Sequence, residues 1–210
     1  DDYYPVFAGD DSPVKKLGWA GFYTSSGITG VTMGLTGEAA VNPEIPAVSL
    51  PFTMCHELSH RRCIALERDA NFGAYLACRA NDSIQFQYSG YFMAYRYCYN
   101  ALVSAGGSVQ AQAISSGETA ELTRDLADYR TFFTQKQSAK ATKVADKVND
   151  TYIKASGDSS GVASYGEVCD LLVNLYLEEE VKPNMVEPDP TFDPLDKSQV
   201  DLGDLVGDWG

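Results

Sequence analysis

The chain of 210 residues has two histidines, and both lie in one pentapeptide, His56-Glu57-Leu58-Ser59-His60. Residues four positions apart share one face of a helix, so both imidazoles can reach a single metal ion there. The glutamate that follows the first histidine lies beside that ion, where it can accept a proton from a bound water. The spacing therefore predicts a zinc site on a helix and a peptidase that uses Glu57 as its general base.

The residues before the pentapeptide also favour a helix. Ser49 is a residue type that caps helix N-termini, and Pro51 is tolerated in a first turn, where its missing amide hydrogen has no partner to lose. Residues 51–55 are mostly apolar, as expected for a helix buried under a sheet. We therefore expect the motif on a helix that begins near Ser49.

A catalytic zinc ion normally has three protein ligands and one open position for water. Because the chain has no third histidine, the third ligand has to be a carboxylate or a thiolate. Cys63 and Leu66 stand where a metzincin has its glycine and its third histidine, which excludes that class. We assign the third ligand to Glu67, and the thiolate of Cys63 stays open as an alternative.

Glu67 can reach the same metal ion only if the chain turns after the motif. In an unbroken helix it would lie about 10 Å beyond His60 along the axis, at about 1.5 Å per residue. Zinc–ligand bonds are only about 2 Å long. We therefore expect a turn within residues 61–66, and a left-handed conformation of Cys63 in that turn would cost about 1–2 kcal/mol.

A second helix is expected from Glu67 to Arg79. Asn71 lies four residues after Glu67, on the same helical face, where its side chain can hydrogen-bond a metal ligand. Asp69 points elsewhere and is expected to be solvated or paired with a cation.

Three stretches, PFTMCHELSH at 51–60, ERDANFGAYLAC at 67–78 and QYSGYFMAYRY at 87–97, resemble the bacterial domain-of-unknown-function family 3810. Matches at 36–42, 148–157 and 161–172 extend the resemblance over most of residues 20–177. That family looks like a group of membrane-associated zinc metallopeptidases with transmembrane helices ahead of the catalytic domain. The resemblance implies one zinc ion per chain, a peptide or protein substrate and a zincin-like fold.

The segment Glu67-x-x-Ala70-Asn71 resembles the E-x-x-A-D/N element of prenyl-protease-like and other gluzincin peptidases. In those enzymes the glutamate is the third zinc ligand, which implies the same role for Glu67. The chain departs from the family at Cys63, where family members have glycine.

Charge and hydropathy restrict the partners of the chain. Its net charge is −13, which disfavours nucleic-acid binding. No run of eighteen apolar residues is present, so nothing in the chain spans a bilayer. The chain starts at Asp1 without an initiating methionine, which suggests that it is part of a longer protein. The family resemblance implies membrane attachment through a segment ahead of residue 1, with this domain soluble and extracytoplasmic.

The C-terminal residues differ in composition from the rest. Residues 178–210 carry ten acidic residues and two lysines, a net charge of −8. We therefore expect a metallopeptidase domain over 1–182 and an acidic tail rich in proline and glycine over 183–210. Docking of the last apolar residues onto the domain is the alternative.

The five cysteines do not form a recognisable disulfide framework, because their number is odd and their spacing is irregular. Cys55, Cys78, Cys98 and Cys169 fall in apolar helical runs and are expected to be buried thiols. The redox compartment therefore stays open.

The remaining sequence predicts an α+β fold that is mainly helical. Residues 1–27 are expected to be irregular, and 28–42 to form strand. By resemblance to other metallopeptidases, 30–42 would provide the sheet edge that precedes the active-site helix and binds a peptide as an added strand. An ordinary core hairpin is the alternative. Helices are expected over 92–103, 118–133 and 134–154, and the second of these follows a capping box at Ser115–Glu118. A second capping box at Ser164–Glu167 begins a further helix, whose buried residues are expected to be Val168, Leu171, Leu172 and Leu175.

The oxyanion that develops during peptide hydrolysis needs a donor besides zinc. With no further histidine, the donor has to be a tyrosine or an arginine. Tyr88, Tyr91 and Tyr165 are our choices, and Arg96 is a further possibility. For each tyrosine the competing interpretation is a core residue with a satisfied hydroxyl.

Three classes of function remain at this stage. The first is an active peptidase. The second is a catalytically latent zinc-binding sensor or partner-binding domain of a membrane protein, an alternative that the cysteine at position 63 keeps open. The third is a structural domain in which the motif occurs by chance. A bound zinc ion with an open position for water would favour the active peptidase, and a zinc ion whose fourth position is blocked would favour the latent domain. The absence of zinc binding would favour the structural domain.

Overall fold

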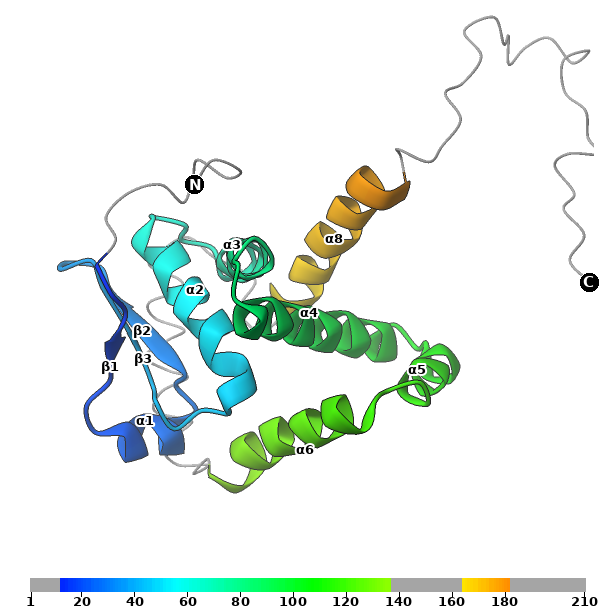
Figure 1. Ribbon diagram of the computed structural model, residues 1–210, viewed down its shortest axis with the longest axis horizontal. Coiled ribbons are helices and arrows are strands. Elements are labelled where there is room, and N and C mark those ends of the chain that lie inside the picture. Colours follow the sequence, from blue (N-terminus) through cyan, green and yellow to red (C-terminus); the bar gives the residue numbers. More distant parts are fainter. Residues whose placement is uncertain (1–11, 137–163, 182–210) are drawn as a thin grey trace, which may run out of the picture. The chain divides into compact units, whose positions relative to one another are not determined.

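The structure is a computed structural model that describes residues 12–136 and 164–181 (Figure 1). The chain divides into two compact units, residues 1–173 and residues 174–210. The described elements are β1 (Lys15–Lys16), α1 (Ala20–Ser26), β2 (Gly30–Met33), β3 (Glu38–Val41), η2 (Ala47–Ser49), α2 (Leu50–Arg61), α3 (Glu67–Arg79), α4 (Ile84–Ser104), α5 (Ser108–Ser115), α6 (Ala120–Gln135), α8 (Ser164–Tyr176) and η4 (Leu177–Val181). The expected α+β class, mainly helical with a small N-terminal sheet, is confirmed.

The sheet has the strand order β1-β3-β2, with β1 parallel and β2 antiparallel to β3. Strand structure within residues 28–42 was expected, and it consists of two strands joined by a tight turn. The strand that directly precedes the motif helix is β3, which lies in the centre of the sheet. Within 30–42 the edge strand is β2, so the expectation that the strand directly before the motif helix forms the sheet edge was wrong.

Helix α2 lies between the sheet and helices α3 and α4 (Figure 1). One side of α2 contacts β2 and β3, and the other contacts α3 and α4. The buried core on that second side consists of Phe52, Cys55, Ala74, Cys78, Phe92, Met93, Tyr97 and Val168. The motif helix is therefore held on both sides, which fixes the direction of its ligand face.

Helix α2 begins at Leu50 with Pro51 in its first turn, as expected. The expected cap is wrong, however, because the Ser49 hydroxyl donates to the carbonyl of Pro46 at 2.9 Å. The buried hydroxyl of Ser89, on α4, instead accepts the amide of Phe52 at 3.0 Å. A neighbouring helix thus satisfies one of the free amides at this terminus.

The end of α2 has the hydrogen bonds of a Schellman turn. The Cys63 amide donates to the carbonyl of His60 at 2.9 Å, and the Ile64 amide donates to that of Ser59 at 3.2 Å. Cys63 lies between them with φ of 64°, the left-handed conformation that such a turn requires. The predicted turn is therefore confirmed, and α3 begins at Glu67 and ends at Arg79 as expected.

Other element boundaries differ from the expected ones. Residues 1–27 were expected to be irregular, but α1 lies among them. Helix α4 begins at Ile84, eight positions before the expected start at 92. Helix α6 is capped by Thr119, whose hydroxyl accepts the Leu122 amide at 3.2 Å, and not by Ser115 or Ser116, which lie at the end of α5.

The C-terminal expectations are tested only in part. Helix α8 begins at Ser164 as expected, and Val168 and Leu172 are buried on it. Most of the helix expected over 134–154, and the tail expected over 183–210, lie outside the described residues.

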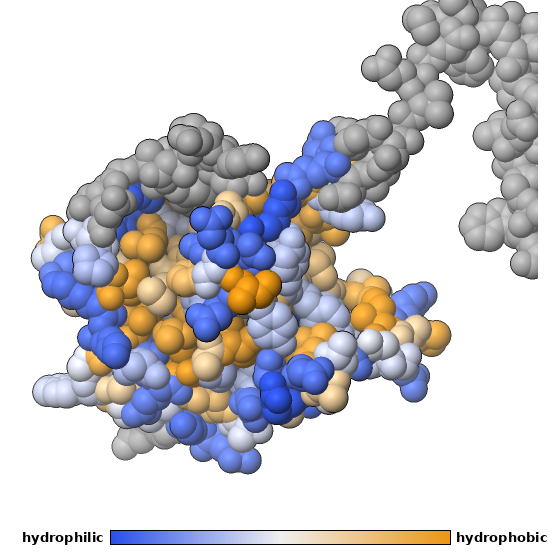
Figure 2. Space-filling view, viewed as in Figure 1, coloured by the Kyte–Doolittle hydropathy of each residue, from blue (hydrophilic) through white to orange (hydrophobic). Residues whose placement is uncertain are grey.

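Two of the cysteines expected to be buried are only half-buried. Cys55 and Cys78 are buried, whereas Cys98 and Cys169 are partly exposed, with their sulfur atoms 3.4 Å apart. In the part of the chain that the structure describes, no helix is long and apolar enough to cross a bilayer. Figure 2 shows apolar and hydrophilic residues interspersed over one face of the molecule.

The left-handed conformation of Cys63 predicts a stabilising substitution. Glycine adopts this conformation without the steric cost that a Cβ atom imposes. We therefore expect Cys63→Gly to unfold with a free energy about 1 kcal/mol higher than Cys63→Ala, which keeps the strain. Urea denaturation with a chelator present measures the difference without any contribution from metal binding. An alanine variant as stable as the glycine variant would contradict the strain.

Candidate metal centre

Three side chains from α2 and α3 converge on one point. The Nε2 atoms of His56 and His60 are 3.1 Å apart. The carboxylate of Glu67 places one oxygen 3.4 Å from the first of these nitrogens and the other oxygen 3.5 Å from the second. Tetrahedral zinc with bonds of about 2.0–2.1 Å separates its ligand atoms by about 3.3–3.4 Å. The separation of the two nitrogens, and that of each nitrogen from its nearer carboxylate oxygen, is therefore close to the spacing of ligand atoms around tetrahedral zinc.

The turn after α2 also orients one of the two imidazoles. Nδ1 of His60 lies 2.8 Å from the carbonyl oxygen of Ile64, the residue that closes the Schellman turn. A carbonyl can only accept, so Nδ1 carries the hydrogen and Nε2 presents its lone pair to the site. Nδ1 of His56 is buried and has no partner among the described residues.

The electrostatics of the three residues also favour a cation. Burial alone would raise the pKa of Glu67, but its hydrogen bonds and charge interactions with both histidines outweigh burial and hold that pKa well below its usual range. Burial lowers the pKa of His60, and its contact with Glu67 more than offsets this, so the pKa of the imidazole is raised. Without a cation, the Nε2 atoms of the two imidazoles, 3.1 Å apart, would direct their lone pairs at each other unless one of them carried a hydrogen.

These residues are the one group of histidine, cysteine and acidic side chains among the described residues whose ligand atoms could hold a metal, all within 4.8 Å of one another. Two imidazole nitrogens and a carboxylate oxygen form a donor set that suits zinc and leaves a fourth position for water. Cys63 is exposed and does not belong to the group. The donor set therefore fits zinc without the alternative thiolate ligand.

Glu57 lies beside the metal group on α2, and its side chain is held by the sheet. The residue is only 5% exposed, and its Oε2 lies 2.7 Å from the hydroxyl of Thr32 on β2. A Cβ atom at Gly30 would stand 2.4 Å from Oε1 of Glu57, so only glycine lets the strand approach this closely. Burial raises the pKa of Glu57 and exceeds the opposing effects of His56 and Thr32. A raised pKa suits a group that accepts a proton near neutral pH.

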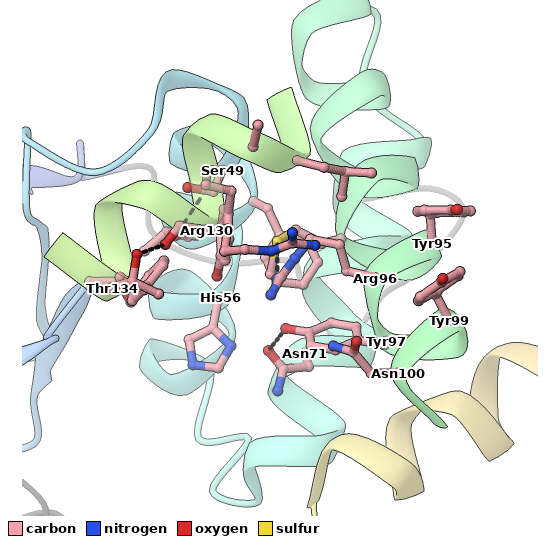
Figure 3. Close-up of a pocket in the computed structure, with 18 of the residues that line it drawn as sticks. Ser49, His56, Asn71, Tyr95, Arg96, Tyr97, Tyr99, Asn100, Arg130 and Thr134 are labelled. Atoms are coloured by element: carbon pink, nitrogen blue, oxygen red, sulfur yellow. Dashed lines mark hydrogen bonds between the residues drawn. The ribbon is translucent and has the colours of Figure 1, made fainter. Parts of the chain in front are cut away.

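A cavity of about 820 Å³ opens beside the metal group. His56, Glu67 and Asn71 line one part of it, and side chains from α4 and α6 line most of the rest. Figure 3 shows the hydrogen bond in which the buried Tyr97 hydroxyl donates to Oδ1 of Asn71 at 3.1 Å. Asn71 is buried one turn beyond Glu67, and its side chain accepts a hydrogen bond from a tyrosine of α4, whereas a metal ligand was the expected partner.

The structure does not bring Tyr88 and Tyr91 to the metal group. The Tyr88 hydroxyl donates to Asp125 at 2.8 Å, and burial together with this bond raises the pKa of Tyr88 to about 12. Tyr91 is 53% exposed and packs edge-on against the ring of Tyr75. Neither lines the cavity. The side chain of Tyr165 lies outside the described residues.

Two features of this site were missed by the sequence reasoning. Thr32 holds Glu57, but a threonine in a strand carries no local sign of a partner on a helix. The second feature is the polar lining of the cavity by α4, where Arg96, named above only as a further possible oxyanion donor, lies with Tyr97 and Asn100. Their spacing places three polar residues on one face of a helix, which is a signal the sequence did offer.

A family model described as "Protein of unknown function (DUF3810)" matches residues 1–173. The chain therefore belongs to this family. No curated protein and no solved structure matches it.

The ligand set predicts the metal content of the protein and of one variant. We expect about one zinc ion per chain after loading and dialysis. Glu67→Ala should lower the zinc affinity by more than about 100-fold, because removing a ligand costs more than removing the residue that orients one. Elemental analysis and competition with a chromogenic chelator measure both quantities.

The matched control is Asp69→Ala, which removes a carboxylate from the same turn of α3. Asp69 pairs with Arg68 and does not belong to the metal group. The Asp69→Ala variant should bind zinc with the affinity of the wild-type protein. Unchanged zinc affinity in Glu67→Ala would show that another residue is the third ligand.

Proposed function

We propose that this member of the DUF3810 family is a zinc-dependent peptidase. The observation that carries the proposal is the convergence of His56, His60 and Glu67, whose ligand atoms lie within 4.8 Å of one another beside a buried glutamate in the H-E-x-x-H motif. Three protein ligands are the number found in catalytic zinc sites, whereas structural sites have four.

A zinc ion bound by His56, His60 and Glu67 would lower the pKa of a water molecule and polarise a peptide carbonyl. Glu57 accepts the proton of the attacking water and passes it to the leaving amine. Its burial and its bond to Thr32 hold it in one position during both transfers.

The open edge of the sheet offers a place for the peptide. The Asn42 amide donates to the carbonyl of Thr29 at 2.8 Å, so this pair is hydrogen-bonded, and bonded pairs alternate along an antiparallel ladder. The amide and carbonyl groups of Gly30 and Thr32 consequently point away from β3. A peptide can add there as a further strand. Thr32 would then contact the general base with its side chain and the peptide with its backbone.

Three parts of the proposal rest on the sequence alone. Tyr165 remains the predicted oxyanion donor. A membrane-associated, extracytoplasmic location remains the one that the family resemblance predicts. A zinc-binding domain without catalysis remains the alternative function, and the following variant separates it from a peptidase.

Glu57→Gln tests the general base. The amide cannot accept the proton, so we expect hydrolysis of a pool of internally quenched random peptides to fall by about 10²- to 10⁴-fold or more. Zinc content should not change, because Glu57 is not a ligand. Glu121→Gln, an exposed position on α6, is the matched control and should keep wild-type activity. An active Glu57→Gln variant would refute the mechanism, and an inactive wild-type protein with bound zinc would favour the latent alternative.

Thr32→Val tests the contact that positions the base. Valine keeps the shape of threonine and removes the hydroxyl, so Glu57 loses its partner from β2. We expect kcat to fall by about 10- to 100-fold, the usual effect of removing a supporting hydrogen bond at a metal site. Zinc content should be unchanged, and Thr32→Ser, which retains the hydroxyl, should keep most of the activity. Equal rates for the valine and serine variants would show that the contact has no catalytic role.

A further inference from the structure

The cavity beside the metal group contains an arginine that is held in place without a carboxylate partner. Arg96 lies half-buried on α4, and Figure 3 shows its side chain in the cavity that His56 also lines. Its Nη1 lies 3.5 Å from the sulfur of Met93, and its guanidinium carbon lies 3.7 Å from the centre of the Tyr129 ring. Contacts from α4 and α6 thus fix the guanidinium in one orientation.

No carboxylate of the described residues forms an ion pair with Arg96, although the chain carries a net charge of −13. The two carboxylates that line the cavity have other partners. Glu67 faces the two histidines of the metal group. Glu118 accepts hydrogen bonds from the hydroxyls of Tyr95 and Thr123. The aromatic ring offsets part of the cost of removing a cation from water, but it satisfies none of the guanidinium N–H donors.

A second arginine lines the same cavity. Arg130 lies on α6, one residue beyond the tyrosine on which Arg96 stacks, and it forms no ion pair with the described residues. A planar guanidinium presents paired N–H donors that match the two oxygens of a carboxylate. Two cationic side chains in one cavity of an acidic protein therefore favour an anionic ligand over a neutral one.

We propose that this cavity binds a substrate carboxylate at Arg96, so that the protein selects peptides that carry an acidic side chain or a free C-terminus near the cleaved bond. This inference rests on the proposed peptidase function, because the bound peptide is a substrate only if the protein cleaves it. The geometry on which it depends is independent of catalysis: a guanidinium stacked on Tyr129 has no carboxylate partner among the described residues, and it lies in the cavity that His56 and Glu67 also line. Arg96 is then the specificity-determining residue.

Binding by the zinc-loaded Glu57→Gln protein tests this inference without turnover. The probe is a mixture of short amidated peptides in pairs that differ only by glutamate or glutamine at one position, together with neutral peptides bearing a free or an amidated C-terminus. Mass spectrometry of the retained peptides gives the preference. We expect about tenfold or greater enrichment of the carboxylate member of a pair, the usual value of a hydrogen bond to a charged group.

The same measurement on arginine variants locates the site. Arg96→Gln and Arg96→Met, each combined with Glu57→Gln, should bring the enrichment close to one. The methionine variant keeps the packing on Tyr129, and zinc content with a thermal melt shows that both are folded. Arg124→Gln is the matched control, since Arg124 is an exposed arginine of α6 outside the cavity, and it should keep the full preference.

The outcomes separate the two sources of the carboxylate. Enrichment of the glutamate peptides identifies a side-chain carboxylate, and enrichment of the free C-termini identifies a terminal one; either supports the inference. Equal retention of acidic and neutral peptides would overturn it, as would a preference that survives in both neutral Arg96 variants. Cleavage of peptides by the wild-type protein without an acidic preference would overturn this inference and leave the proposed function standing. A wild-type protein that neither retains nor cleaves any peptide would contradict both.

Discussion

The site depends on one reversal of the chain between α2 and α3. The Schellman turn at Cys63 ends α2 directly after the second histidine and lets Glu67 return to the face that carries both imidazoles. The same turn presents the carbonyl of Ile64 to Nδ1 of His60, which fixes the tautomer that a metal requires. One local conformation therefore supplies the third ligand and orients the second. This conformation is sterically strained because Cys63 has a Cβ atom, and glycine at this position would not be strained.

The sheet and the helices then have separate tasks around this turn. Strand β2 holds Glu57 through Thr32 and approaches it closely because Gly30 has no side chain. Helix α4 holds the start of α2 through Ser89, and it lines the cavity with Arg96. The proton acceptor is thus positioned from one side of α2, and the substrate cavity is built from the other. In our proposal the peptide lies along the edge of β2 and extends into that cavity.

The parts of the site that could be predicted from the sequence are those set by local geometry. The spacing of the histidines, and the distance that an unbroken helix would put between His60 and Glu67, require the turn that the structure shows. The residues that come from other elements were not predictable in this way. Thr32 reaches Glu57 only because β2 packs on α2. The expected tyrosine donors on α4 face Asp125 and Tyr75, since the direction of a helix face depends on what it packs against.

The coordination of zinc by the loaded protein tests the central claim most directly. X-ray absorption at the zinc edge reports the number, type and distance of the ligand atoms. A metal held by His56, His60 and Glu67 with one open position gives a four-coordinate shell of nitrogen and oxygen at about 2.0–2.2 Å, with imidazole scattering and one exchangeable water. A sulfur ligand at about 2.3 Å would place Cys63 on the metal and contradict the assignment.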